Sequence, residues 1–201
     1  MEVVVGEDGV ARCWWGTSTP DYQEYHDHEW GTPVADDFTL FEKLCLEGFQ
    51  SGLSWLTVLR KREDFRRVFH GFDYDKVAAM GDRDVERLLQ DASIIRHRGK
   101  IEATINNAQC ALEVREELGS LGALLWRYEP ADRVPTELMA TTDESTAMAK
   151  ELKKRGFRFF GPTTAYAFMQ AMGLVNDHLV GCAARDRVSA ARAGFTRPGA
   201  V

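Results

Sequence analysis

The chain has 201 residues, a formal net charge of −6 and four cysteines. Its apolar content of 44% and charged content of 28% are typical of one folded domain and exclude a wholly disordered chain. No apolar run approaches the ~20 residues of a membrane span, and Met1–Val5 lacks the basic start of a secretory signal, so we expect a cytoplasmic protein with no membrane partner.

Charge is unevenly distributed along the sequence. Residues 1–47 hold eleven acids and two bases, a net charge of −9, whereas residues 48–201 hold 20 acids and 23 bases, a net charge of +3. The total argues against a nucleic-acid partner. The bases nevertheless gather at 60–67, 96–100 and 153–158, and such clusters predict a surface that binds a polyanion. The alternative is that they are solvated faces of surface helices.

Helix signals follow one another from residue 36 onwards. Residues 1–10 are expected to form a mobile N-terminal arm, with a possible short strand at 2–5. Capping side chains stand ahead of apolar residues spaced three and four apart at Asp36 or Asp37, Ser54, Asp73, Asp82 and Thr142. The predicted class is therefore all-α, with residues 11–184 as a single domain.

Three further helices complete the prediction. A long helix begins near Lys100, another has Pro162 at its first position, and Asn176 or Asp177 caps the last. Residues 185–201 are rich in Ala, Arg, Gly and Pro and are expected to form a flexible C-terminal tail.

Cysteines and histidines occur near both ends of this domain. His178 and Cys182 are four residues apart, so on a helix they share one face. Cys13 with His26, or with His28, could complete a tetrahedral zinc site, which would be structural because four protein ligands leave no open position. Reducing compartments favour metal binding over disulfides. The alternative is two buried cysteines and two hydrogen-bonded histidines.

Aromatic residues surround one carboxylate in the sequence. Tyr22, Tyr25 and Trp30 fall within nine residues, and Trp55 follows Glu47 by eight. Aromatic faces beside a carboxylate form a good receptor for a flat cation. The alternative is a glutamate that caps a helix or forms a salt bridge beside a core tryptophan.

Residues 88–101 read as two apolar helices joined by a tight turn that contains basic residues and Gly99. Backbone amides at the start of the second helix can bind a phosphate, and Arg98 and Lys100 would add charge. The alternative is an ordinary corner between two helices.

Together these segments resemble the 3-methyladenine DNA glycosylase I family of bacterial base-excision repair. The most specific are Tyr-His-Asp-x-Glu-Trp-Gly at 25–31 and Asn-Asp-His-x-x-Gly-Cys at 176–182. The matching segments are 12–14, 21–22, 25–31, 41–42, 46–48, 50–55, 58–59, 61–63, 84–88, 94–101, 153–157, 174–178 and 181–182.

The resemblance implies a helix-hairpin-helix DNA glycosylase fold, with the hairpin at 94–101 and a zinc staple that joins the N- and C-terminal segments. The implied zinc ligands are Cys13, His26, His178 and Cys182. The implied pocket for the flipped base contains Tyr22, Tyr25, Trp55 and the catalytic Glu47, which reads the edge of the adenine. The implied DNA-binding residues are Gln50, Gly52, Leu53, Arg96, Arg98, Gly99 and Lys100.

The implied reaction is hydrolytic release of 3-methyladenine from alkylated double-stranded DNA by a monomeric bacterial enzyme, which leaves an abasic site. Methylation at N3 makes the base cationic and a good leaving group. Other helix-hairpin-helix glycosylases place an aspartate after the hairpin, but here none occurs between Asp91 and Asp132. No lysine is an evident Schiff-base nucleophile, and we expect Lys100 to contact phosphate, so the enzyme would be monofunctional.

Two positions depart from what the family leads us to expect, because Trp14 and Phe49 are larger or less polar there. Phe49 would reshape the surface that faces DNA. Two rival functions also remain. One is a glycoside hydrolase with paired carboxylates such as Glu29 and Glu47, which leaves the basic clusters unexplained. The other is a zinc-stapled, non-catalytic helix-hairpin-helix DNA-binding protein.

Overall fold

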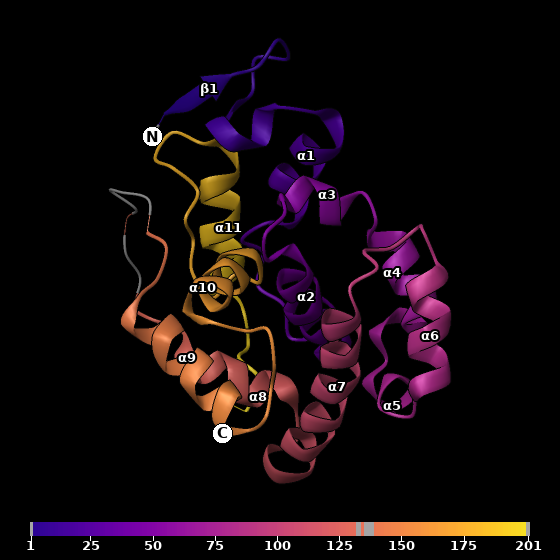
Figure 1. Ribbon diagram of the computed structural model, residues 1–201. Helices are drawn as coiled ribbons and strands as arrows, with labels where there is room; N and C mark the ends of the chain where they lie inside the picture. Colours follow the sequence, from indigo (N-terminus) through magenta and orange to yellow (C-terminus); the bar gives the residue numbers. More distant parts are fainter. Residues whose placement is uncertain (1, 132–133, 135–138, 200–201) are drawn as a thin grey trace.

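The computed structural model describes residues 2–131, 134 and 139–199, and they are mostly helical (Figure 1). The elements are β1 (Val3–Val5), β2 (Ala11–Cys13), the 3-10 turn η1 (Trp14–Thr17), α1 (Pro20–Glu24), the π-helical turn η2 (Tyr25–Glu29), α2 (Asp37–Gln50), α3 (Trp55–Leu59), α4 (Arg62–Val68), η3 (His70–Phe72), α5 (Tyr74–Val77), α6 (Asp82–Gln90), α7 (Arg98–Leu118), α8 (Leu121–Leu125), η4 (Trp126–Tyr128), α9 (Asp143–Lys154), α10 (Pro162–Ala171) and α11 (Ala183–Ala193). None of the described helices is long and apolar enough to cross a membrane.

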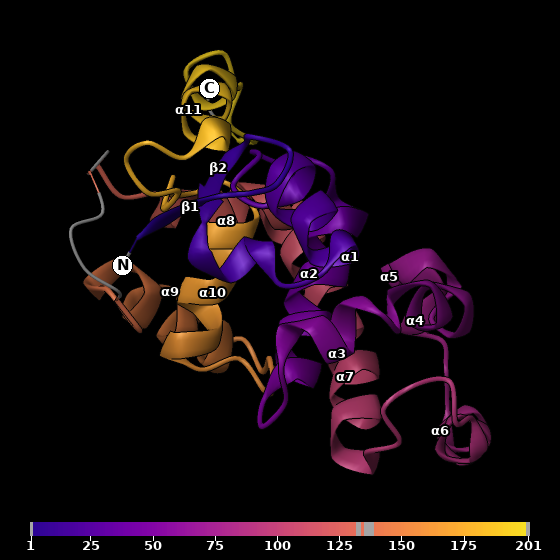
Figure 2. The ribbon, with the colours of Figure 1, turned by 90° about the horizontal axis from the view of Figure 1, so that it is seen from above.

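Helix α2 lies at the centre of the molecule and packs against α3, α7, α8 and α10. Figures 1 and 2 show α4, α5 and α6 on one side of α2 and α7, with α9 and α10 on the other. The side chain of Asp36 caps α2 by accepting from Thr39 N, 2.8 Å away. Neighbours on several sides bury most of this helix, polar residues included. Any ionisable side chain that points inward from α2 must therefore find a buried partner.

The predicted caps at Ser54, Asp73 and Thr142 are confirmed, since each side chain accepts from a backbone amide of the first turn. The helix predicted from Ser54 ends earlier than expected. Lys61 has φ −102° and ψ 0°, which separates α3 from α4. Helix α6 is preceded by Gly81 rather than capped by Asp82.

The N-terminal segment forms a β-hairpin rather than a single strand. The strand expected at 2–5 is confirmed, and it pairs antiparallel with β2, with Val3 opposite Cys13. Arg12 donates to Asp8 and Asp27, which ties the hairpin to η2. The pairing partner lay outside the expected arm, so local pattern did not reveal it. Residue 1 lies outside the described residues.

The C-terminal prediction is wrong in two respects. No helix begins at Asn176 or Asp177, because residues 176–182 form a loop with Gly181 at φ +88° and α11 begins after Cys182. Where a flexible tail was expected from residue 185, α11 runs to Ala193. The Asn176 amide donates to Arg185 O and Ser189 Oγ at 3.0 and 2.9 Å, so side-chain contacts that composition does not reveal hold this helix. Residues 200–201 lie outside the described residues.

Candidate active site and metal centre

A cavity of about 260 Å³ opens between the N-terminal turns, α2, α3 and α10. All four residues predicted for the base pocket line it, together with aromatic and polar residues that sequence reasoning did not assign to the pocket. The lining residues are Trp14, Trp15, Tyr22, Tyr25, Trp30, Glu47, Gln50, Trp55, Met139, Ala167, Gln170, Asp177 and Leu179. The cavity is therefore an aromatic box with polar groups at a few places in its wall.

Glu47 is the buried acid that α2 contributes to this wall, and 5% of it is exposed. Its Oε1 lies 2.7 Å from Lys43 Nζ, one helical turn earlier. Lys43 Nζ also donates to the Tyr25 hydroxyl at 3.0 Å and lies 3.1 Å from the centroid of a Trp55 ring. Glu47 in the cavity wall therefore belongs to a buried ion pair, and its partner Lys43, which is not a lining residue, packs against aromatic side chains. Sequence reasoning missed Lys43, although its i,i+4 spacing to Glu47 was the available signal.

Burial shifts the ionisation of these groups. Loss of hydration lowers the pKa of Lys43 to about 8, although the Glu47 carboxylate acts in the opposite direction. Burial raises the pKa of Tyr25 well above its usual value, and burial together with the Glu47 charge raises that of Tyr22. Both phenols are therefore neutral near pH 7, so these two lining residues keep their hydroxyl protons.

The pKa of Lys43 predicts how stability depends on pH. A lysine with a folded pKa of about 8 against an ordinary 10.5 binds fewer protons in the folded state between those values. The free energy of unfolding should therefore rise as pH rises from about 8, by up to about 3 kcal/mol. Urea unfolding of wild type and Lys43→Met from pH 7 to 10 checks this. Equal slopes in both proteins would contradict it.

The aromatic rings of the box contact one another closely. Tyr22 and Tyr25 are stacked with ring centroids 6.3 Å apart, and Tyr25 lies 5.5 Å from Trp55. Trp15 packs edge-on against Trp30 at 4.8 Å. The Trp55 Nε1 atom is the single buried side-chain N or O atom without a hydrogen-bond partner in the described part of the chain. Because this nitrogen is itself buried, Trp55 meets the cavity through other atoms of its indole.

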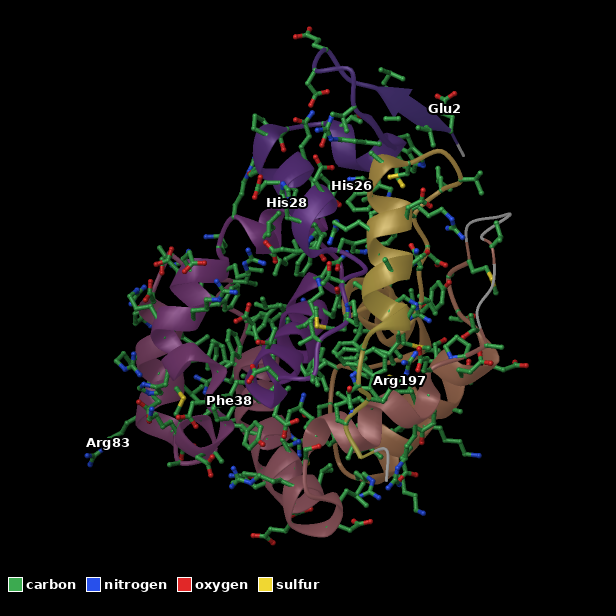
Figure 3. The ribbon with its side chains drawn as sticks, turned by 180° about the vertical axis from the view of Figure 1, so that it is seen from behind. Glu2, His26, His28, Phe38, Arg83 and Arg197 are labelled. Atoms are coloured by element: carbon green, nitrogen blue, oxygen red, sulfur yellow. The ribbon has the colours of Figure 1, made fainter. Side chains whose placement is uncertain are left out.

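The four predicted metal ligands come together beside this cavity. Cys13, His26, His178 and Cys182 are all buried, and their ligand atoms lie within 4.8 Å of one another. Cys182 Sγ is 3.5 Å from both His26 Nε2 and His178 Nδ1. Figure 3 shows His26 beside α11, whereas His28, the alternative ligand, has an exposed side chain. His178 and Cys182 meet through the loop before α11 and not, as expected, on one face of a helix.

The surroundings of the four residues suit a metal ion. His26 Nδ1 lies 2.8 Å from Asp27 Oδ1, and His178 Nε2 lies 3.0 Å from Trp30 O. Each imidazole therefore donates its remote N–H to an oxygen and turns the other nitrogen toward the cluster, as metal-binding histidines do. The backbone amide of Leu179 donates to Cys13 Sγ at 3.3 Å, which favours a thiolate there. Two sulfur and two nitrogen donors match the preference of tetrahedral Zn²⁺.

Residues 15–186 match the methyladenine glycosylase family. The chain belongs to that family. It is 52% identical to DNA-3-methyladenine glycosylase 1 of Escherichia coli (strain K12) over 179 residues, which is 86% of this chain and 96% of the relative. The crystal structure of a 3-methyladenine DNA glycosylase I is also similar, with a TM-score of 0.82 and 51% identity over 86% of this chain and 98% of that one.

A second solved structure is of a 3-methyladenine DNA glycosylase I variant in complex with 3-methyladenine. It matches this chain with a TM-score of 0.82 and 38% identity, over 87% of this chain and 97% of that one. Shared fold and family therefore agree with the expectation from the sequence motifs. Much of α11 lies beyond the residues that the family match covers.

The loop after α2 lies at the edge of the cavity in this member of the methyladenine glycosylase family. Gln50 lines the cavity, Gly52 has φ +80°, and Leu53 is 43% exposed. Phe49, expected to reshape the surface that faces DNA, instead lies in the core with its ring 4.5 Å from Phe65. Trp14, the other unusual residue, lines the cavity with an exposed side chain.

Lys100, which we predicted to contact phosphate, does not face solvent. It is 8% exposed, and its Nζ donates to Phe49 O at 2.9 Å and to Ser51 O at 2.6 Å. Carbonyl groups at the end of a helix lack intrahelical partners, and Lys100 supplies one for α2. The ammonium group of Lys100 therefore holds the loop after α2 in place, and these two hydrogen bonds do not support the phosphate contact that we predicted for it.

The other predicted hairpin residues lie on the surface. Arg98 Nη2 is 2.6 Å from Glu86 Oε1, whereas Arg96 is exposed and has no ion pair among the residues that the structure describes. Gly99 lies in the first turn of α7, whose N-cap is His97. The predicted hairpin at 94–101 thus offers Arg96, an exposed cation without an ion pair in the described part of the chain, and the N-terminus of the long helix α7.

Much of the basic cluster at 60–67 is neutralised within the molecule. Arg60 pairs with Asp21, Arg62 with Glu29 and Arg66 with Glu42. Acids of residues 1–47 therefore pair with the cluster that we expected to bind a polyanion. Glu29 pairs with Arg62 and does not line the cavity, so the structure does not bring Glu29 and Glu47 together as the hydrolase alternative requires.

Proposed function

We propose that this protein is a DNA glycosylase that flips 3-methyladenine out of alkylated duplex DNA and releases it, leaving an abasic site. The buried carboxylate of Glu47 in the wall of an aromatic cavity carries the proposal. A base inside a duplex is reachable only when it is flipped into such a pocket. The names of the homologous enzymes support the same substrate.

The cavity suits a purine that carries positive charge. The rings of Tyr22 and Trp55 offer their faces, and Glu47 offers the charge that attracts the cation and accepts from the exocyclic amino group. Because Lys43 already holds Glu47 Oε1, the second carboxylate oxygen is the one available to the base. Attraction to the alkylated base exceeds that to neutral adenine, which gives selectivity.

The reaction we propose is direct hydrolysis. The bond between C1′ and N9 breaks with its electron pair moving to the base, which neutralises the cation. Water oxygen bonds to C1′ and loses its proton to solvent. Lys43 is bound to Glu47 and Lys100 to two carbonyls, so neither buried lysine is free to form a Schiff base. We therefore infer a monofunctional enzyme.

We also propose that Cys13, His26, His178 and Cys182 bind a structural Zn²⁺. The ion would join β2 and η2 to the loop before α11, behind the aromatic box. Four protein ligands leave no position for water or substrate, so the metal would supply no chemistry to the reaction. We further propose that the protein acts as a monomer on alkylated double-stranded DNA in the bacterial cytoplasm.

The test is the release of free base from methylated duplex DNA, separated by chromatography. We expect 3-methyladenine to appear with the wild type and abasic sites to form in equal amount. Duplex binding without base release would instead support the non-catalytic DNA-binding alternative. Absence of both binding and release would reject the proposal.

The position of Trp55 in the cavity wall predicts a role in base binding. Trp55→Phe keeps an aromatic face but makes it smaller, so the affinity for free 3-methyladenine should fall roughly fivefold, about 1 kcal/mol. Calorimetric titration measures this. Trp14→Phe, at an exposed lining position, is the control and should change affinity less. Equal affinity of Trp55→Phe and wild type would contradict the prediction.

A further inference from the structure

The segment between α9 and α10 contains a phenylalanine in a disfavoured backbone conformation. Phe159 has φ +55°, the left-handed region that bulky side chains avoid. Among the described non-glycine residues, His70 and Phe72 share this property, but Phe72 is fully buried in the core whereas Phe159 is 43% exposed. Strain that presents an apolar ring to solvent is a feature found at functional sites.

Buried neighbours hold this backbone in place. The side chain of Asn107, on α7, donates to Arg158 O at 3.0 Å and accepts from Arg158 N at 2.8 Å. Gly48, on α2, leaves room for the next peptide, because a Cβ there would lie 3.2 Å from Phe159 O. The strained conformation is therefore imposed by α2 and α7 and is not a property of a free loop.

The ring of Phe159 lies against the predicted hairpin at residues 94–101, which leads into α7. Its Cζ is 3.5 Å from the position that a Cβ on Gly99 would take, and its centroid is 6.0 Å from that of the His97 ring. Figures 1 and 2 show the segment between α9 and α10 passing beside the start of α7. Lys100 in turn links the start of α7 to the loop that carries Leu53. These three segments form one surface.

This surface carries uncommitted positive charge. Arg96 and Arg158 are both exposed, and neither forms an ion pair within the part of the chain that the structure describes. We call Leu53, Arg96, Gly99, Arg158 and Phe159 the hairpin face. Cations beside a helix N-terminus favour a polyanion. A single exposed ring is too small an apolar area for a stable protein partner.

We propose that Phe159 is a DNA-docking side chain that packs against the deoxyribose edge of the minor groove, while Arg158 contacts a neighbouring phosphate. The inference rests on the proposed function, because it names a contact to the same duplex. Apolar side chains that enter the minor groove are a recurrent means of holding distorted DNA. The strain at Phe159 is then the cost of directing its ring outward at a fixed place beside the hairpin.

Phe159→Gly tests this because stability and binding should change in different directions. Glycine adopts φ +55° freely, so the melting temperature should stay equal or rise. Affinity for a duplex with a stable abasic-site analogue should fall on the order of tenfold. Titration with free 3-methyladenine should be unchanged, since Phe159 does not line the cavity. Phe38→Ala, at a similarly exposed phenylalanine on α2, should leave duplex affinity unchanged.

Salt dependence separates the two side chains. Arg158→Ala should lower the slope of log affinity against log salt by about one, whereas Phe159→Gly should leave the slope unchanged. Unchanged duplex affinity of Phe159→Gly in an otherwise active protein would overturn the inference, as would a lowered melting temperature. A wild type that neither binds duplex nor releases base would overturn the proposed function itself.

Discussion

Glu47→Gln should lower the rate of 3-methyladenine release on the order of 100-fold, because it removes a buried carboxylate from the cavity wall and leaves the positive charge of Lys43 unbalanced near a cationic base. Glutamine has nearly the same shape, so the cavity should lose charge without gaining volume. Binding of free 3-methyladenine, followed by the fluorescence of the cavity tryptophans, should weaken as well. Single-turnover release from methylated duplex measures the chemical step directly.

Two further variants make this experiment decisive. Glu47→Gln leaves Lys43 buried without its counter-charge, which destabilises the fold. The double variant Lys43→Met with Glu47→Gln removes both charges, and it should fold but remain inactive. Glu63→Gln, whose carboxylate is exposed and far from the cavity lining, should retain full activity. Wild-type activity in a folded Glu47 variant would sink the proposed role.

Cys182→Ser should abolish stoichiometric zinc binding and lower the stability of the protein. Loss of a bound metal from the cluster would cost about 3 kcal/mol or more, a fall in melting temperature of roughly 6–12 °C. The ligand cluster joins segments more than 150 residues apart, so this loss should free the N-terminal hairpin and η2. Metal analysis and thermal unfolding of the purified protein measure both effects.

Cys110→Ala provides the matched control. Cys110 is also a buried cysteine, but it lies on α7 outside the cluster, so its replacement should leave the zinc content unchanged. A chelator should lower the melting temperature of the wild type and of the control. It should not lower the melting temperature of Cys182→Ser any further. Wild-type protein without metal, or Cys182→Ser with one zinc per chain, would reject the metal centre.

Residues that act through local chemistry were predictable from the sequence. The caps at Ser54, Asp73 and Thr142 act on amides two or three residues ahead, so the linear pattern contains the whole interaction. The Cys/His set and the aromatic residues around Glu47 were also recognisable, because their spacing and family motifs identify them without coordinates. The structure then places these residues in one cavity and one cluster.

Residues whose role depends on distant segments were predicted less well. Lys43 was missed as the partner of Glu47, because the i,i+4 spacing places both side chains on one helix face but does not say that this face is buried. The prediction of a flexible C-terminal tail was wrong because contacts with distant residues hold α11 in place. Asn176 donates to Ser189 on this helix, and Arg192 on this helix donates to Gly173 O. Composition alone describes only the tendency of an unsupported segment to fray.

The charge distribution shows the same division. Amino-acid order alone establishes how many charges there are, that acids gather in residues 1–47 and bases later, and which local motifs accompany them. Which of these charges face solvent depends on the fold: Arg62 and Arg66 pair with N-terminal acids, Lys100 turns inward to carbonyls, and Arg96 stays exposed. The reason is physical. Ion pairing and desolvation depend on distances of a few ångströms between segments far apart in the chain, and chain order does not specify those distances.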